Sequence, residues 1–241
     1  TVTSLGSSLD NAAGTVEYDG GTQTVLSDNY FNLEIDESGV KTAGGNLDID
    51  GNLTISNSAV LDMDDGNDRI LDLEGDFTIA SSGNFTARAG SHDILGNWDG
   101  SGGIFQSTSE GTVTLSGTSK TITTGVSNSF YNLIIDGTVS TSGSNDIVVE
   151  MELNVNASKS LTVSPGDVMT LEDATVSGTL TVDADGSNSA TLDFSTATGT
   201  VDFAITGTLN LDGEDASNRA IVLSDNDSRI DFDISSAGIL N

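Results

Sequence analysis

Residues 51–56 read GNLTIS and residues 75–80 read GDFTIA, so one short pattern occurs twice in close succession. Two further copies are GTLTVD at 178–183 and GTLNLD at 207–212, and MELNVN at 151–156 is the same pattern without its glycine. Each copy alternates apolar and polar residues between turn-forming residues, which is typical of a half-buried β-strand. Strands that recur at intervals of roughly 24 to 29 residues indicate the coils of a three-faced solenoid.

The repeats predict an all-β fold in the form of a parallel β-helix, or β-solenoid, with about nine coils of roughly 24–29 residues. In such a fold each coil pairs with the next one, and alternate residues of every strand face the core. Asn32 and Asn132, each between an aromatic residue and a leucine, are expected to hydrogen-bond backbone groups at a corner. The residues expected to stack as ladders in the core are Leu53, Ile55, Phe77, Ile79, Leu180, Val182, Leu209 and Leu211.

The charge and composition exclude several classes of protein. Acidic residues number 37 against 7 basic ones, a net charge of −30, so the chain lacks the basic surface that nucleic acids require. It has no cysteine and one histidine, which excludes thiolate and histidine-rich metal centres. No apolar run reaches the roughly 20 residues that span a bilayer, so we expect no membrane insertion. Two explanations of the acidity stay open: the turn chemistry of aspartate, and either calcium coordination or a saline habitat.

A longer duplication lies over the short repeats. Residues 14–36 and 111–136 share the elements G-T-V and N-L-x-I-D, which predicts a supra-repeat of 14–110 and 111–210 within one β-solenoid domain, 1–241. The C-terminal sequence Gly-Ile-Leu-Asn looks like the start of another short repeat, and neither end shows a polar capping segment. We therefore expect either a segment of a longer chain or a filament subunit.

Three sequence elements carry a resemblance to a known group of proteins. They are G-T-V-x-[YL]-x-G at 14–20, [FY]-[YF]-N-L-x-I-D at 30–36 and G-x-L-T-[IV] at 51–55, with second copies of the first two at 111–117 and 130–136. They resemble the β-strand-repeat segments of large secreted prokaryotic surface proteins, including adhesin-like exoproteins. The resemblance implies a right-handed parallel β-helix, an extracellular or cell-surface location, and service as a stalk, adhesin or fibre body.

Four closely spaced aspartates, Asp62, Asp64, Asp65 and Asp68, are the candidate metal ligands. Calcium takes six to eight oxygen ligands, and a turn rich in aspartate supplies several of them. The cluster does not have the register of an EF-hand loop, because its glycine, Gly66, is the fifth residue counted from Asp62. A solvated turn between coils is the alternative interpretation. Calcium is thus the one cofactor that the sequence suggests, and we expect none to be required.

No catalytic constellation is predicted. The single histidine, His92, lies in the sequence Gly-Ser-His-Asp and is expected in a surface loop, where no nucleophile accompanies it. The seven basic residues are scattered, so they form no groove for an acidic polysaccharide. The only tryptophan, Trp98, suggests either stacking on a sugar ring or a local hydrophobic contact.

Thr-x-Thr pairs recur along the chain, and flat ladders of such pairs on a β-solenoid can bind ice. Their sequence period is not constant, however, and threonine favours strands in any case, so we do not expect ice binding. The pairs are Thr22/Thr24, Thr112/Thr114, Thr121/Thr123, Thr179/Thr181 and Thr196/Thr198.

The expected function is that of a structural extracellular protein, which forms a filament, stalk or surface layer by stacking or lateral association of β-solenoids. Its expected partners are copies of itself or the rest of a longer surface protein. The alternative is an adhesin segment that binds carbohydrate or a host surface, and an insertion-rich loop at 88–110 would favour it. A polysaccharide-active β-helix enzyme is less favoured.

Overall fold

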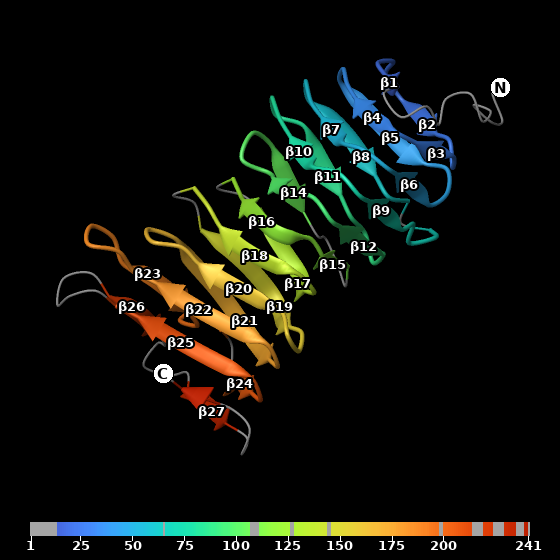
Figure 1. The fold of residues 1–241 in the computed structure, drawn as a ribbon. Helices are drawn as coiled ribbons and strands as arrows, with labels where there is room; N and C mark the ends of the chain where they lie inside the picture. Colours follow the sequence, from blue (N-terminus) through green and yellow to red (C-terminus); the bar gives the residue numbers. More distant parts are fainter. Residues whose placement is uncertain are drawn as a thin grey trace. The chain divides into compact units, whose positions relative to one another are not determined.

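The computed structural model describes residues 14–64, 66–106, 111–125, 128–143, 146–197, 200–213, 219–223, 229–234 and 239–240. These residues form β-strands joined by turns, in two compact units, Thr1–Thr114 and Leu115–Asn241. Every described strand pairing is parallel, as the register of β7 (Leu53–Ile55) on β10 (Phe77–Ile79) illustrates. The predicted all-β, right-handed parallel β-helix is therefore confirmed (Figure 1). No helix that could cross a membrane is present among the described residues.

In unit 1 each coil contributes one strand to each of three stacks. The first stack contains β1 (Thr15–Tyr18), β4 (Asn32–Ile35), β7, β10 and β13 (Trp98–Asp99). The second contains β2 (Gln23–Val25), β5 (Gly39–Ala43), β8 (Ala59–Asp62), β11 (Asn84–Thr86) and β14 (Ile104–Gln106). The third contains β3 (Asn29–Tyr30), β6 (Leu47–Ile49), β9 (Leu71–Leu73) and β12 (Ser91–Ile94). Strand β15 (Thr112–Leu115) spans the division between the units.

In unit 2 the same arrangement contains longer strands. The first stack contains β16 (Thr118–Thr123), β18 (Thr138–Thr141), β20 (Ser160–Val163), β22 (Thr179–Asp183), β25 (Thr208–Asp212) and β28 (Ile239–Leu240). On the other faces, β17 (Ser129–Ile135), β19 (Ile147–Val155) and β21 (Val168–Val176) each run through two stacks. The following coils divide these stacks between β23 (Ala190–Asp193) and β24 (Thr200–Ile205), then β26 (Ala220–Leu223) and β27 (Arg229–Ile234).

The coils differ in length more than the sequence repeats indicate. Thr15 pairs with Asn32, whereas Thr208 pairs with Ile239, so the later coil takes nearly twice as much chain as the earlier one. The spacing of the short repeats therefore describes only some coils, and the predicted number of coils holds approximately. Part of the extra length is in the strands, since β25, β26 and β27 are longer than β1, β2 and β3, and the paired strands nevertheless keep their register.

The core consists of ladders of apolar side chains in register. In unit 1 one ladder runs from Leu33 through Leu53 and Phe77 to Trp98, and all four are buried. Seven of the eight predicted core residues are buried; Leu211 is the exception and is half-exposed. The described part of β28 ends at Leu240, which pairs with Leu209, so no described residue stacks over Leu211.

Corner positions in unit 1 are joined by a side-chain ladder. The Asn32 side-chain oxygen accepts a hydrogen bond from the Asn52 amide (2.8 Å), and the Asn52 oxygen accepts one from the Asp76 amide (2.9 Å). An Asp76 carboxylate oxygen then accepts one from the Asn97 amide (2.8 Å). The predicted role of Asn32 is confirmed. Asn132 lies instead beside a surface hollow in unit 2.

The short repeat is not confined to one stack. In unit 1, residues 32–35 pair with the copy in β7. In unit 2, the equivalent residues 132–135 pair with the glycine-free copy in β19, whereas the copies in β22 and β25 belong to the other sheet. The pattern therefore specifies a half-buried strand after a corner, and any face of the solenoid can use such a strand. The single-domain prediction and the supra-repeat boundaries stay predictions.

Candidate functional site

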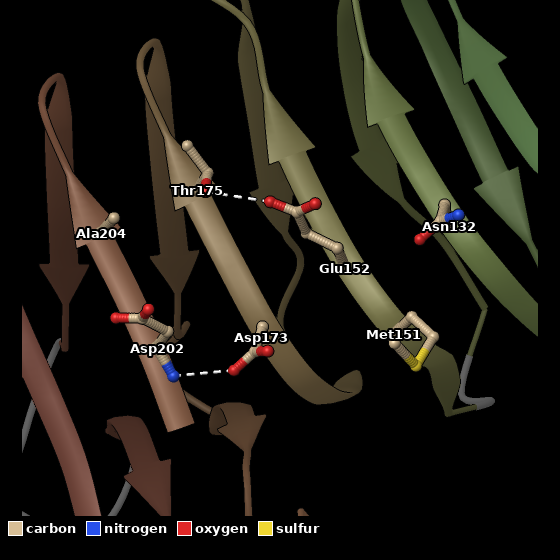
Figure 2. Close-up of a pocket in the computed structure, with 7 residues that line it drawn as sticks. All are labelled: Asn132, Met151, Glu152, Asp173, Thr175, Asp202 and Ala204. Atoms are coloured by element: carbon tan, nitrogen blue, oxygen red, sulfur yellow. Dashed lines mark hydrogen bonds between the residues drawn. The ribbon is translucent and has the colours of Figure 1, made fainter. Parts of the chain in front are cut away.

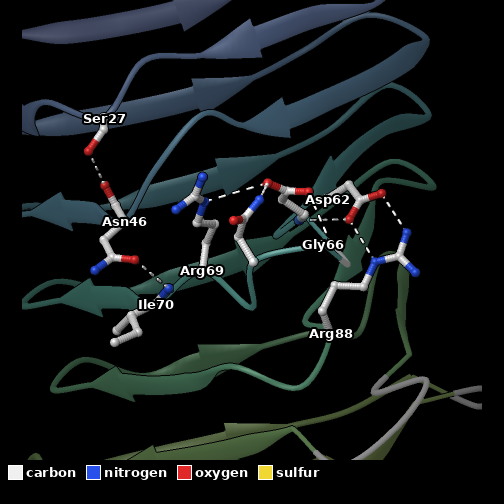
Figure 3. A network of polar contacts seen from close by, with 9 residues as sticks. Ser27, Asn46, Asp62, Gly66, Arg69, Ile70 and Arg88 are labelled. Atoms are coloured by element: carbon white, nitrogen blue, oxygen red, sulfur yellow. Dashed lines mark hydrogen bonds and ion pairs between the residues drawn. The ribbon is translucent and has the colours of Figure 1, made fainter.

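The acidic turn after β8 is held by two arginines (Figure 3). Both carboxylate oxygens of Asp62 accept hydrogen bonds from Arg88, at 2.8 Å from Nε and 2.6 Å from the terminal nitrogen. Asp64 accepts hydrogen bonds from the side-chain amide of Asn67 (2.8 Å) and the backbone of Gly66 (3.3 Å), and lies 3.5 Å from Nε of Arg69. These hydrogen bonds, more than the arginines, hold the pKa of Asp64 below its usual range.

The structure brings only part of the candidate calcium set together. Asp62 and Asp64 lie in the same turn, where Asp62 also accepts the Asp64 amide (3.1 Å). Asp68 is exposed and has a positive φ of 47°, and Asp65 lies outside the described residues. Within the described ranges, no three side chains of histidine, cysteine, aspartate or glutamate form a metal-binding group. Calcium binding here stays a prediction, and the observed chemistry is ion pairing with guanidinium groups.

His92 is buried, so the expectation of a surface loop is wrong. It lies in β12 with 1% exposure, accepts the Leu71 amide at Nδ1 (3.3 Å), and is 2.8 Å from the Ala87 carbonyl at Nε2. Its ring packs edge-on against Phe85, with 5.5 Å between ring centroids. Burial lowers the pKa of His92 to about 4, against the opposing effect of the Ala87 hydrogen bond. The histidine thus joins neighbouring backbone segments as a neutral ring.

Trp98 is a core residue and is not presented to solvent. It has 0% exposure and stacks on Phe77, with 4.4 Å between ring centroids, and its ring meets Phe105 edge-on at 4.8 Å. The hydrophobic-contact interpretation is therefore confirmed. The part of 88–110 that the structure describes includes strands β12, β13 and β14. This segment therefore belongs to the regular solenoid, and its tryptophan is not available to a sugar.

A surface hollow of about 300 Å³ lies on the outward side of β17, β19, β21 and β24 (Figure 2). Three carboxylates occupy successive strands there. Glu152 pairs in register with Asp173, and Asp173 accepts a hydrogen bond from the backbone amide of Asp202 (2.7 Å). The lining residues are Asn132, Met151, Glu152, Asp173, Thr175, Asp202 and Ala204.

The hollow is a row of hydrogen-bond acceptors beside an apolar edge. Glu152 accepts a hydrogen bond from the Thr175 hydroxyl (3.1 Å), and Met151 is 45% exposed. Such a surface suits hydroxyl donors or cations better than anions. Sequence reasoning missed it because the three acidic residues lie far apart, and unevenly spaced, in the sequence. One feature of the sequence could have revealed the hollow: each of the three acidic residues directly precedes a buried apolar residue of its strand, namely Leu153, Ala174 or Phe203.

The first described coil begins with β1, whose outer edge has no partner among the strands that the structure describes. Among the described strands, β1 pairs only with β4. Asn32 donates its amide to the Gly14 carbonyl (3.0 Å), and Asp36 donates to the Tyr18 carbonyl (3.1 Å). Because alternate residues of a parallel strand bond to one neighbour, the backbone groups of Thr15 and Glu17 face the opposite edge.

Comparisons with protein-family models, with curated proteins and with solved structures find no match.

Proposed function

We propose that the chain is a structural element of an extracellular filament, stalk or surface layer, which assembles by stacking or lateral association of β-solenoids. It acts without catalysis and needs no cofactor. Its partners are copies of itself or the rest of a longer surface protein. The observation that carries the proposal is the outer edge of β1, which pairs with no described strand and to which a further strand can add in register.

The side chains of β1 support addition at this edge. Val16 and Tyr18 pair with Leu33 and Ile35 and continue their ladders. Leu33 and Ile35 are buried, whereas Val16 and Tyr18 are half-exposed. A strand added to β1 would cover these apolar groups and bond the outward amides and carbonyls of Thr15 and Glu17.

The buried polar residues support a structural role rather than a catalytic one. Lys41 has 0% exposure, and its ammonium group donates to the carbonyls of Asp36 and Glu37. His92 is equally enclosed and bonds to backbone on both sides. Both side chains hydrogen-bond backbone groups and so stabilise the coils, although an ammonium group and an imidazole ring are the kinds of group that catalysis would use.

The charge supports a location in which counterions are abundant. A net charge of −30 favours solubility but opposes close approach of two copies. Salt shortens the screening length to about 8 Å at physiological ionic strength and about 3 Å at 1 M. Assembly should therefore strengthen as ionic strength rises.

The test is electron microscopy and light scattering of the chain at low and high salt, with the edge variant Glu17→Pro and its control Glu17→Gln. Proline at position 17 removes an outward amide and leaves the inner pairing of β1 intact. We expect the wild type and Glu17→Gln to form elongated assemblies at high salt, and Glu17→Pro to remain short. Monomers under every condition for the wild type would reject the proposal.

The hollow in unit 2 favours a second candidate function, an adhesin segment that binds carbohydrate. Carboxylates accept hydrogen bonds from sugar hydroxyls, and Met151 offers apolar contact beside them. Glycan-array binding that is lost in Asp173→Asn and kept in Asp183→Asn would support this function. Equal binding by both variants would count against it.

A further inference from the structure

Four neighbouring strands of unit 2, namely β18, β20, β22 and β25, carry hydroxyl and amide side chains at their outward positions. Each outward position lies beside a buried core residue, as Thr138 and Ser140 flank Val139. Apart from Asp183 and Asp212, which end β22 and β25, the outward residues of the four strands are Thr138, Ser140, Ser160, Thr162, Thr179, Thr181, Thr208 and Asn210. We name this surface the hydroxyl face.

These side chains form two rows in register. One row is Thr138, Ser160, Thr179 and Thr208, and the other is Ser140, Thr162, Thr181 and Asn210. Successive members are unevenly spaced in the sequence, yet they pair directly. Within the second row, the Asn210 amide donates to the Thr181 hydroxyl (3.4 Å). The irregular period that the sequence shows therefore becomes a regular array in space.

The two rows of the hydroxyl face carry no charge, whereas several other outward rows of this acidic chain do. In the same unit, Glu152, Asp173 and Asp202 line the hollow on another face. In unit 1, Glu17 and Glu34 pair at outward positions of the first stack. Two molecules of net charge −30 meet at least cost where no carboxylates oppose one another.

From this we infer that the hydroxyl face of unit 2 is the surface through which two copies of the chain associate side by side. The inference rests on the proposed function and names the face that lateral association uses. The chemistry of the face selects a copy as the partner. Each hydroxyl both donates and accepts hydrogen bonds, so a hydroxyl array is complementary to itself. A two-fold interface requires such self-complementarity.

The small side chains of the hydroxyl face and the carboxylates at its rim are both compatible with a second copy as the partner. Two sheets of small side chains can pack about 10 Å apart and interdigitate, as stacked sheets do in dry interfaces. Asp183 and Asp212, in register with each other, end two of the four strands and lie at the rim. A hollow of about 310 Å³ beside them is lined by Thr181, Asn210, half-exposed Leu211 and Asp212. Salt should strengthen association by screening these rim carboxylates.

The absence of cysteine from the chain permits a direct test. Thr181→Cys places one thiol on the hydroxyl face, and Thr175→Cys places one on the acidic face of the same unit. With a short bifunctional maleimide reagent at high salt, we expect Thr181→Cys to give a covalent dimer at least about tenfold faster than Thr175→Cys, because only thiols that face each other across the interface lie within reach of one reagent molecule. Equal rates for the two variants would overturn the assignment.

A charge variant gives an independent measurement by analytical ultracentrifugation. Thr181→Asp places a carboxylate in the interface on each copy and should weaken dimerisation by at least about tenfold at low salt. Its control Thr181→Asn keeps the face neutral and should dimerise like the wild type. Circular dichroism checks that both variants keep the β fold. Equal dimerisation by the two variants would reject the hydroxyl face as the interface.

The two proposals fail in different ways. Wild-type assemblies that persist without a Thr181→Cys cross-link would overturn this inference alone, because they would then form through coil ends. A wild type that is monomeric at every concentration and salt would overturn both. Retention of the monomer on ice or on an insoluble polysaccharide, abolished by Thr181→Asp, would assign the hydroxyl face to that ligand and reject the copy as its partner.

Discussion

Gly96 lies so close to Gly75 that a β-carbon added at Gly96 would stand 1.9 Å from the Gly75 carbonyl oxygen. The relationship repeats one coil earlier, where a β-carbon at Gly75 would meet the Gly51 carbonyl oxygen at 2.2 Å. Gly75 also donates its amide to that oxygen (3.0 Å). The glycine of the short repeat is thus required by the close approach of successive coils at a corner, because any side chain would separate them.

Gly96→Ala should therefore lower the free energy of unfolding by about 1–3 kcal/mol, the usual cost of forcing an atom into a packed site. Gly21→Ala is the matched control, since an added β-carbon there meets no atom within 4 Å. That control should be neutral or stabilising by up to about 1 kcal/mol, because alanine restricts the unfolded chain. Urea unfolding of both variants measures the difference, and equal midpoints would contradict the argument.

The aromatic cluster of unit 1 should dominate its stability. Phe77 stacks on Trp98 and meets Phe85 edge-on, with ring centroids 4.4 Å and 5.2 Å away. Phe77→Ala should cost about 3–5 kcal/mol, since a buried aromatic ring is replaced by a cavity. Leu211→Ala should cost much less, because Leu211 is already half-exposed. Chemical denaturation that found the larger loss at Leu211 would disprove this ranking.

His92 should make stability depend on pH. Burial lowers the pKa of its folded form to about 4 from the ordinary 6.5, so between these values the unfolded chain binds a proton that the folded chain excludes. Stability contributed by the neutral ring is therefore complete above pH 6.5 and falls toward pH 4, by about 3 kcal/mol in total. His92→Phe should be less stable at pH 7, since the Leu71 amide loses its acceptor, but should lose less stability on acidification.

Denaturant titrations of both proteins across this pH range measure the effect. The carboxylates titrate in both proteins, so the difference between the two curves isolates His92. If the free energy of unfolding had the same pH dependence in the wild type and in His92→Phe, protonation of His92 would not destabilise the folded protein.

Arg88 should compete with calcium for Asp62. Its guanidinium group occupies both carboxylate oxygens, which a cation would otherwise use. We expect calcium to raise the melting temperature of Arg88→Gln more than that of the wild type, because a ligand that binds only the folded state stabilises it. Arg88→Lys keeps the charge without the planar fork and should respond between the two. Melting curves in calcium and in chelator give the comparison, and an identical calcium shift in all three proteins would refute it.

The alternation of residues such as Leu53, Thr54 and Ile55 was sufficient to predict the strands and the direction of their side chains. Parallel pairing followed from the recurrence of the pattern. The length of each coil could not be predicted, because turns of different length return the chain to the same register. Motif spacing therefore reported only the coils that happened to be similar.

The candidate sites were harder to predict than the fold. His92 has polar neighbours in the sequence, Ser91 and Asp93, and these suggest exposure. In β12 the alternation points His92 inward, and backbone groups from other segments make its burial favourable. The carboxylates of the hollow and the rows of the hydroxyl face depend on coil-to-coil register, which is a property of the stack and not of any single segment.

The near-twofold variation in coil length at constant register, from the coil that begins at Thr15 to the one that begins at Thr208, has an evolutionary consequence. Insertions and deletions in the turns leave the inward ladders in place, so the corners are the sites where such a chain can gain or lose residues without refolding its core. A lineage that carries this solenoid can diversify its surface by changing turn length while the strand positions, and the spacing that they impose on outward side chains, are inherited unaltered.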